Sequence, residues 1–274
     1  MKGNIYLSVT QHESFLHWQL QRPERRNALG PTLGQALRQA LDALQSELKL
    51  WQEQNDLSLS PPYRGLVLSA DVSGSNAPST PVWIAGGDLK ELAQLSTPQE
   101  GRAYATSFAT IGQDLQNLPI PVIAAIDGLV IGGGVEFALA ADLRISTQRS
   151  AFHFKQLEVG LSTGYASCQR LVALVGEARA TDLLLLRRCL SSSDAKAYGL
   201  LNEVVEDQTE LIGLLNSWEK EFSALSPWSL AAQKRMLQGR SALGRDVCTE
   251  KELTWFEELW MHPWHRRFLQ KFLK

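Results

Sequence analysis

The sequence is poor in cysteine and nearly balanced in charge. Its 274 residues include three cysteines, Cys168, Cys189 and Cys248, which are widely spaced and form no Cys-x-x-Cys pair. Neither a disulfide framework nor a zinc site is therefore expected, and we expect no bound metal. A formal net charge of −2 provides no electrostatic reason to expect nucleic-acid binding.

Membrane segments and nucleotide motifs are also missing. The first residues, MKGNIYLSVTQHE, contain no apolar signal core, and no segment approaches the roughly eighteen uninterrupted apolar residues of a membrane span. We therefore expect a soluble cytoplasmic protein without a membrane partner. The sequence has no GxxxxGK[ST] motif, and a GxGxxG motif starting at Gly132 would need glycine where Phe137 stands. The P-loop and dinucleotide classes are excluded on this basis.

The pattern of apolar residues predicts an α/β protein. Hydrophobic residues make up 44% of the chain, which is enough for a sizeable core. Strand-like runs alternate with helical patterns in the first two thirds, and long helical patterns follow. We expect a core domain over residues 1–207 and a helical region over residues 208–274.

Two glycine turns stand out as candidate sites. The buried strand Pro121–Ile126 leads to Gly132-Gly133-Gly134 and a short apolar helix that carries Glu136, and the strand Val82–Ile84 leads to Gly86-Gly87. Backbone N–H groups of two such turns can converge on one oxygen as an oxyanion hole. Alternatively, both turns only pack tightly, and Glu136 only stabilises the helix dipole.

Three motifs, in order, resemble those of the enoyl-CoA hydratase/isomerase (crotonase) family. They are RPERRNAL at 22–29, WIAGGDLKEL at 83–92 and PVIAAIDGLVIGGGVEFALAADLRI at 121–145. The similarity continues through CQRL at 168–171, AKAYGLLNEVV at 195–205 and LWMHPWHRRFL at 259–269, so it covers nearly the whole chain. The resemblance implies a crotonase-like spiral of ββα units with nearly perpendicular sheets, a C-terminal helical region, and a homotrimer or homohexamer.

The resemblance also implies an active site for an acyl-CoA thioester. The N–H groups of Gly87 and Gly133 would hold the thioester oxygen as an enolate forms, and Glu136 would be the acid or base. Coenzyme A enters as part of the substrate, and no other cofactor is implied. The positions that border the CoA moiety or the acyl pocket are Arg26, Ala28, Leu29, Ala85, Lys90, Gln156, Glu158 and Tyr165, and the aromatic residues that cover the pocket are Trp260, Trp264 and Phe268. The alternative for Lys90 is an ordinary solvated lysine, and the alternative for the aromatic stripe is ordinary core packing.

One position departs from the family pattern. Hydratases of this family use two glutamates, and Glu136 matches the first, whereas Gln156 falls at the second. Glutamine is neither an acid nor a base. A shift of register or a local bulge would bring Glu158 into that place.

Three functions therefore stay open at the level of sequence. The first is an enoyl-CoA hydratase or isomerase. The second is a decarboxylase of a methylmalonyl- or ethylmalonyl-CoA-like substrate, because FHFKQLEVGL with Gly164-Tyr165 is similar to the branch with ethylmalonyl-CoA decarboxylase-like members. Tyr165, Lys155 and His153 are its pocket candidates, or else ordinary packing and surface residues. The third is a non-catalytic protein that binds CoA esters.

Overall fold

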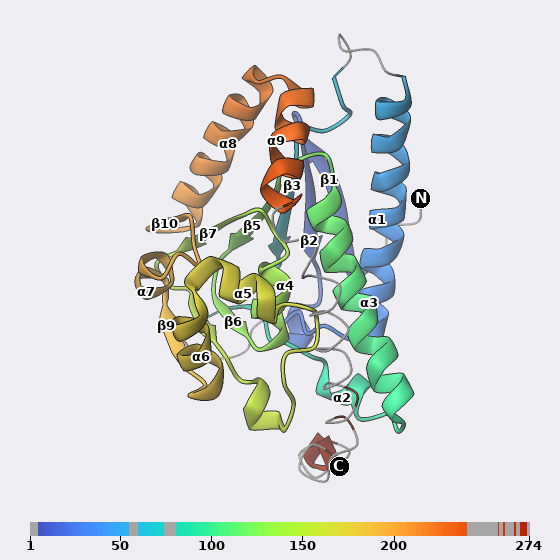
Figure 1. Ribbon diagram of the computed structural model, residues 1–274, viewed down its shortest axis with the longest axis vertical. Coiled ribbons are helices and arrows are strands. Elements are labelled where there is room, and N and C mark those ends of the chain that lie inside the picture. Colours follow the sequence, from blue (N-terminus) through green and yellow to red (C-terminus); the bar gives the residue numbers. More distant parts are fainter. Residues whose placement is uncertain are drawn as a thin grey trace.

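The strands in the described part of the chain form two sheets (Figure 1). The computed structural model describes residues 5–54, 60–73 and 81–239, together with 257, 260, 266 and 269–272. In this part, the strands are β1 Leu7–His12, β2 Phe15–Leu20, β3 Gly65–Ala70, β4 Val82–Ile84, β5 Val122–Ile126, β6 Leu129–Ile131, β7 Leu143–Thr147, β8 Ala151–His153, β9 Cys189–Ser191 and β10 Glu203–Val205. The helices are α1 Pro31–Glu53, α2 Leu89–Leu92, α3 Pro98–Asn117, α4 Gly133–Ala138, α5 Cys168–Val175, α6 Glu177–Leu185, α7 Ser192–Ala197, α8 Gln208–Ala224 and α9 Pro227–Gly239, with 3-10 turns η1 Pro23–Arg25, η2 Gln156–Val159 and η3 Gln270–Phe272.

A ββα unit recurs along the chain. The first strand of each unit, β3, β5 or β7, joins the sheet ordered β1-β2-β3-β5-β7-β10. The second strand, β4, β6 or β8, joins the sheet ordered β4-β6-β8-β9. Strands from successive units pair in parallel within each sheet. The predicted ββα architecture is confirmed, although the short strands β6, β9 and β10 were not predicted, because their place depends on pairing with strands distant in sequence.

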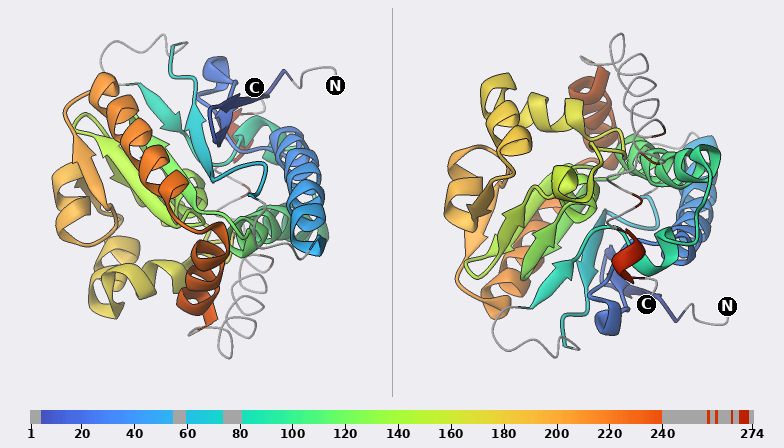
Figure 2. Two further views of the ribbon diagram at one scale, coloured as in Figure 1. Left: turned by 90° about the horizontal axis from the view of Figure 1, so that it is seen from above. Right: turned by 90° about the horizontal axis from the view of Figure 1, so that it is seen from below.

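Alternating side chains give the larger sheet two buried faces. Leu66 and Leu68 of β3 pack into the cluster that contains the leucines of α1 and the apolar face of α3. Val67, between them, packs with Ile123 and with Leu211 of α8 on the opposite face. This is the two-residue period of a strand. Figure 2 accordingly shows α1 and α3 side by side on one flank and α8 across the other.

Local signals place two helix starts that matter for the site. Thr97 and Glu100 form the predicted capping box at the start of α3, which carries one wall of the site. Helix α4 was expected over 135–141 but begins at Gly133, because Gly132 adopts a φ of 51° and turns the chain early. Gly133 is therefore the first residue of the helix, where N–H groups lack intrahelical acceptors.

Helix α8 packs against β7 and β10 of the larger sheet. Helix α8 was expected over 209–222 and extends over 208–224, and α9 starts at the predicted Pro227. Most of the helix predicted over 249–274 lies outside the described residues.

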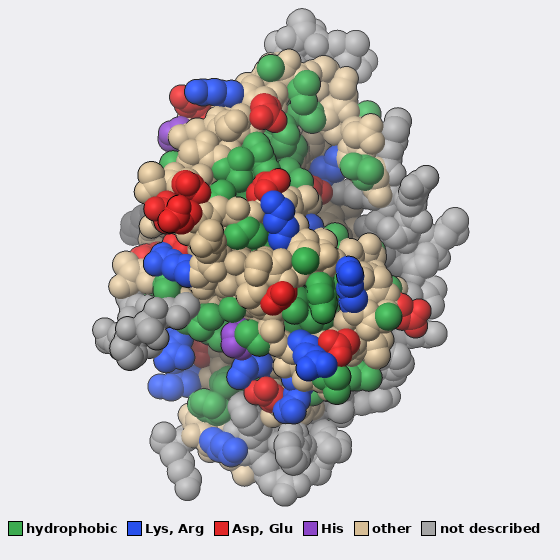
Figure 3. Space-filling view, turned by 90° about the vertical axis from the view of Figure 1, so that its left-hand side faces the viewer, with side chains coloured by type: hydrophobic (Ala, Val, Ile, Leu, Met, Phe, Trp, Pro, Cys, Tyr) green, Lys and Arg blue, Asp and Glu red, His purple; other side chains and the backbone are tan. Residues whose placement is uncertain are grey.

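No described helix is both long and apolar enough to cross a membrane. On the face formed by the left-hand elements of Figure 1, acidic and basic side chains are interspersed (Figure 3).

Candidate active site

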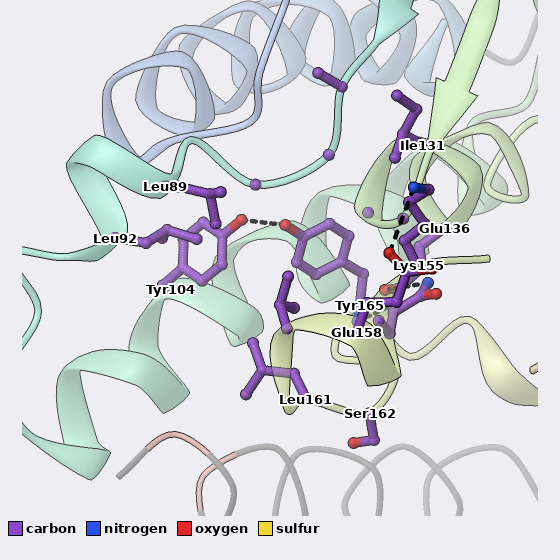
Figure 4. Close-up of a pocket in the computed structure, with 17 residues that line it drawn as sticks. Leu89, Leu92, Tyr104, Ile131, Glu136, Lys155, Glu158, Leu161, Ser162 and Tyr165 are labelled. Atoms are coloured by element: carbon purple, nitrogen blue, oxygen red, sulfur yellow. Dashed lines mark hydrogen bonds and ion pairs between the residues drawn. The ribbon is translucent and has the colours of Figure 1, made fainter. Parts of the chain in front are cut away.

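A cavity of about 290 Å³ lies where the two glycine turns meet (Figure 4). One turn follows β4 and the other follows β6, so the parallel pairing of these strands brings both turns to the same end of the sheet. The cavity is lined by Ala85, Gly86, Gly87, Leu89, Leu92, Tyr104, Ile131, Gly132, Gly133, Glu136, Lys155, Gln156, Glu158, Val159, Leu161, Ser162 and Tyr165. The sequence-predicted donors and the predicted acid or base thus share one cavity.

The glycines of the two turns have different functions. A Cβ on Gly86 would lie 2.8 Å from the Ile131 carbonyl oxygen, and one on Gly134 would lie 2.6 Å from the Ile84 carbonyl oxygen. These two glycines allow tight packing. Gly87 and Gly133 line the cavity, and their N–H groups have no hydrogen-bond acceptor among the described residues. Two unpaired donors at a cavity wall are the arrangement of an oxyanion hole.

Glu136 is a buried carboxylate held by four donors. Its Oε2 accepts from the backbone N–H groups of Gly164 and Tyr165, both at 2.9 Å, and from the Ser167 hydroxyl at 2.8 Å. Its Oε1 accepts from Nε2 of Gln156 at 3.1 Å. Burial raises the pKa of Glu136 above its ordinary value, and these hydrogen bonds oppose part of that rise. A raised pKa suits a group that exchanges protons near neutral pH.

Gln156 and Glu158 both reach the cavity because their segment is not extended. Residues 156–159 form the 3-10 turn η2, and both side chains line the cavity. Gln156 contacts Glu136 directly. Glu158 is half-buried and pairs with Lys155 Nζ at 3.4 Å, so this carboxylate lies on the cavity wall with a cation beside it. Lys155, a candidate pocket residue, also lines the cavity.

Two tyrosines form one wall. Tyr165, predicted from the sequence, is buried, and its hydroxyl is hydrogen-bonded to that of Tyr104, which lies on α3 (Figure 4). The sequence reasoning missed Tyr104 as a site residue and placed it only on the apolar face of a helix. The two positions are 61 residues apart, so no local pattern could pair them.

Of the positions predicted to border the CoA moiety or the acyl pocket, Ala85 lines this cavity with Gln156, Glu158 and Tyr165, whereas Arg26, Ala28, Leu29 and Lys90 do not. Arg26 and Lys90 have exposed side chains, whereas Ala28 and Leu29 are buried. Residues 26–29 support the first glycine turn, because Leu29 N donates to Gly86 O at 2.7 Å and Ala85 N donates to Arg26 O at 3.0 Å. Their contact with CoA stays a prediction.

The remaining candidates contribute indirectly. The backbone carbonyl of His153 accepts from Gly132 N at 2.8 Å, and its ring contacts the Cys189 sulfur at 3.2 Å, so this residue supports the second turn. Trp260 is buried, with its ring centroid 6.1 Å from that of Tyr104. Trp264 and Phe268 lie outside the described residues.

Comparison with known proteins identifies the family. A profile described as enoyl-CoA hydratase/isomerase matches residues 63–273, and the chain belongs to this family. It is 32% identical over 191 residues to the mitochondrial methylglutaconyl-CoA hydratase of Mus musculus, covering 70% of this chain and 54% of that protein. It is 32% identical over 219 residues to the enoyl-CoA isomerase/hydratase fer4 of Mycosarcoma maydis, covering 80% of this chain and 74% of that protein.

A solved structure shares the fold. The enoyl-CoA hydratase from Bacillus halodurans superimposes with a TM-score of 0.80 at 22% identity, covering 97% of this chain and 99% of that one. The chain spans about half the length of the mammalian methylglutaconyl-CoA hydratases that it matches, 54% in the mouse protein. The crotonase fold and the family are therefore established, and the substrate is a separate question.

Proposed function

We propose that the protein binds an acyl-CoA thioester and stabilises its enolate with the N–H groups of Gly87 and Gly133. The observation that carries this proposal is the meeting of two unpaired backbone donors at the wall of one cavity. A thioester oxygen placed between them gains negative charge as the enolate forms, and preorganised donors stabilise that charge more than they stabilise the ground state.

Glu136 is the proton carrier in this proposal. Three of its four hydrogen bonds go to Oε2, and Oε1 accepts only one, so Oε1 keeps a lone pair for a substrate proton. Glu136 is in the same first helical turn as Gly133 and lines the same cavity, which supports a role for its carboxylate at the thioester's α-carbon. Its raised pKa increases its affinity for the proton that it removes.

A single proton-carrying carboxylate favours movement of a double bond. Isomerisation of an enoyl-CoA needs one group that removes a proton at one carbon and returns it at another. Gln156 orients Glu136 but cannot exchange a proton itself. Hydration would in addition need activation of water, and Glu158 is the carboxylate on the cavity wall for that role. We therefore assign isomerase chemistry to Glu136 and any hydratase activity to Glu136 with Glu158.

Purified protein offered 3-enoyl-CoA and 2-enoyl-CoA esters tests this assignment. We expect double-bond isomerisation, with turnover reduced at least about 100-fold by Glu136→Gln. Glu158→Gln should reduce hydration and spare isomerisation. Glu177→Gln, an exposed change in the first turn of α6, is the matched control and should keep wild-type rates. Wild-type turnover in the Glu136 variant would refute the assignment.

Decarboxylation is the second candidate. Gln156 stands where the family pattern has a second glutamate, so the site lacks that acid but keeps the N–H donors of Gly87 and Gly133. Loss of carbon dioxide from a methylmalonyl- or ethylmalonyl-CoA-like ester needs the oxyanion hole but no base that removes a carbon-bound proton. Carbon dioxide release that survives Glu136→Gln, while isomerisation does not, would favour it. Tight binding of these esters with no turnover of any of them would instead indicate a CoA-ester-binding protein.

The assembly and cofactor requirement complete the proposal. We expect a homotrimer or homohexamer, as the family resemblance implies, with coenzyme A supplied only as part of the substrate. Light scattering of the purified protein, and turnover without added cofactor, test the two statements separately.

A further inference from the structure

A series of hydrogen bonds that passes along the tyrosine wall of the cavity connects the two glycine turns. It starts at the first turn, where Leu29 runs beside Gly87 in a parallel bridge. Leu29 N donates to Gly86 O at 2.7 Å, and Asp88 N donates to Leu29 O at 3.0 Å. The Gly87 peptide is therefore bracketed on both sides by Leu29.

The series of hydrogen bonds continues through the buried hydroxyls of two tyrosines. The Tyr104 hydroxyl donates its single proton to Leu29 O at 2.9 Å. In the hydrogen bond between the two hydroxyls, Tyr165 must then be the donor and Tyr104 the acceptor. The rings meet edge to face with centroids 5.8 Å apart, and the Phe108 ring stacks on Tyr165 at 5.0 Å. Burial raises the pKa of both phenols, so both keep their protons at neutral pH.

The series of hydrogen bonds ends at the second glycine turn. Tyr165 N donates to Glu136 Oε2, and Glu136 N donates to Gly132 O at 3.3 Å. The Tyr165 ring also fills the space beside Gly133, because a Cβ there would lie 2.9 Å from the ring. Tyr165 thus contacts the second turn through both its backbone and its ring.

Such a connection matters because the donor-bearing glycines have no side chains with which to fix their own positions. Catalytic groups must be held within about 0.5 Å of the productive geometry by their supporting residues. Gly87 and Gly133 belong to different ββα units, so the distance between their N–H groups depends on contacts between units. The phenol pair is such a contact, since Tyr104 bonds to the Gly87 side and Tyr165 to the Gly133 side.

We infer that Tyr104 and Tyr165 are positioning residues that set the separation of the Gly87 and Gly133 donors. The expected effect on kcat rests on the proposed oxyanion hole, whereas the expected effect on the position of the two turns does not. Each hydroxyl is a link in one series, so removal of either link loosens both turns. The Tyr104 hydroxyl takes part in both bonds of the series, so removal of both hydroxyls has about the same effect as removal of the Tyr104 hydroxyl alone.

Hydrogen-exchange mass spectrometry of the free protein tests the structural consequence. Tyr104→Phe and Tyr165→Phe keep both rings and remove one hydroxyl each. We expect amides in residues 26–29, 85–88 and 132–136 to exchange about five- to tenfold faster in Tyr165→Phe, which loses one hydrogen bond, and at least as much faster in Tyr104→Phe, which loses two. Exchange that stays at the wild-type rate, or that rises only in the turn nearest the altered ring, would overturn the inference.

Kinetics test the catalytic consequence separately. In each single variant and in the double variant, kcat should fall about tenfold, with KM changed less than about twofold, because the donors act mainly in the transition state. Tyr198→Phe is the control and should keep wild-type values. It also removes one tyrosine hydroxyl, but the Tyr198 ring lies under Arg179 and does not line the cavity. Multiplying effects in the double variant would overturn the series arrangement. A wild-type protein without turnover would refute the proposed function, and the exchange data would still decide the inference.

Discussion

Gln156 donates a hydrogen bond from Nε2 to Oε1 of Glu136 over 3.1 Å. The Oε1 atom of Gln156 itself is buried and receives no hydrogen bond from any donor in the described part of the chain. A glutamine at this position orients the carboxylate and adds no second proton. A buried polar atom without a partner costs free energy. The arrangement therefore favours chemistry that uses one carboxylate, and it leaves the Gln156 carbonyl available to a substrate donor.

The first prediction concerns this position. Gln156→Glu would put a second carboxylate beside Glu136, and the pair would share a proton near neutral pH because two adjacent negative charges repel. We expect hydration of a 2-enoyl-CoA to rise at least about tenfold relative to isomerisation. The matched control is Gln156→Leu, which removes the amide without adding an acid. Equal hydration by the two variants would contradict the prediction.

The second prediction concerns the pH dependence of stability. The raised pKa of Glu136 means that the folded protein binds this proton more tightly than the unfolded chain does. Its contribution to the free energy of unfolding is therefore largest at low pH and falls as pH rises from the ordinary value of 4.5 towards the raised value. Urea unfolding of wild type and Glu136→Gln across this range should show that the fall is absent in the variant. Parallel curves would contradict the assigned pKa direction.

The third prediction concerns the oxyanion turn. Gly133→Ala places a Cβ 2.9 Å from the Tyr165 ring, which must move or displace the Gly133 N–H. We expect turnover to fall about 100-fold, the effect of one lost oxyanion donor. Gly213→Ala in α8 is the control, because its Cβ meets no atom within 4 Å. It should raise the unfolding free energy by about 0.5–1 kcal/mol and leave turnover unchanged.

The fourth prediction concerns the attachment of α8. Glu219 accepts from Ser14 N at 2.6 Å, Phe15 N at 2.7 Å, the Ser14 hydroxyl at 3.0 Å and His12 Nδ1 at 3.2 Å. We expect Glu219→Ala to lower the unfolding free energy by about 2–3 kcal/mol, because buried N–H groups lose their acceptor. Glu221→Ala, at an exposed position on α8, should change it little. Equal urea midpoints for the two variants would contradict this role.

The same carboxylate also has a pH signature opposite to that of Glu136. Burial raises the pKa of Glu219, but the hydrogen bonds from Ser14, His12 and Phe15 outweigh it and lower the pKa overall. Its stabilising contribution is present above the ordinary value of 4.5 and is lost as pH falls through the lowered value. In Glu219→Ala, the loss of stability on acidification should be smaller than in wild type.

Several parts of the fold were predictable because their causes are local. The capping box at Thr97 and the leucine stripe of α1 depend on residues three to four positions apart, and both formed as predicted. The short strands β6, β9 and β10 were missed, because their place depends on pairing with strands distant in sequence. The start of α4 was misplaced by two residues, because the glycines permitted a turn that composition alone does not specify.

The sequence by itself determined that a strand ends at Gly86-Gly87, that three glycines stand at 132–134, and that Glu136 follows them. These features depend on residue types and spacings that any chain with this local sequence carries. Only the tertiary structure decided that Tyr104 joins Tyr165, that Gln156 holds Glu136, and that the unpaired N–H groups of both turns line one cavity. The physical reason is that hydrogen bonds between residues far apart in sequence depend on packing of the ββα units, which local patterns do not encode.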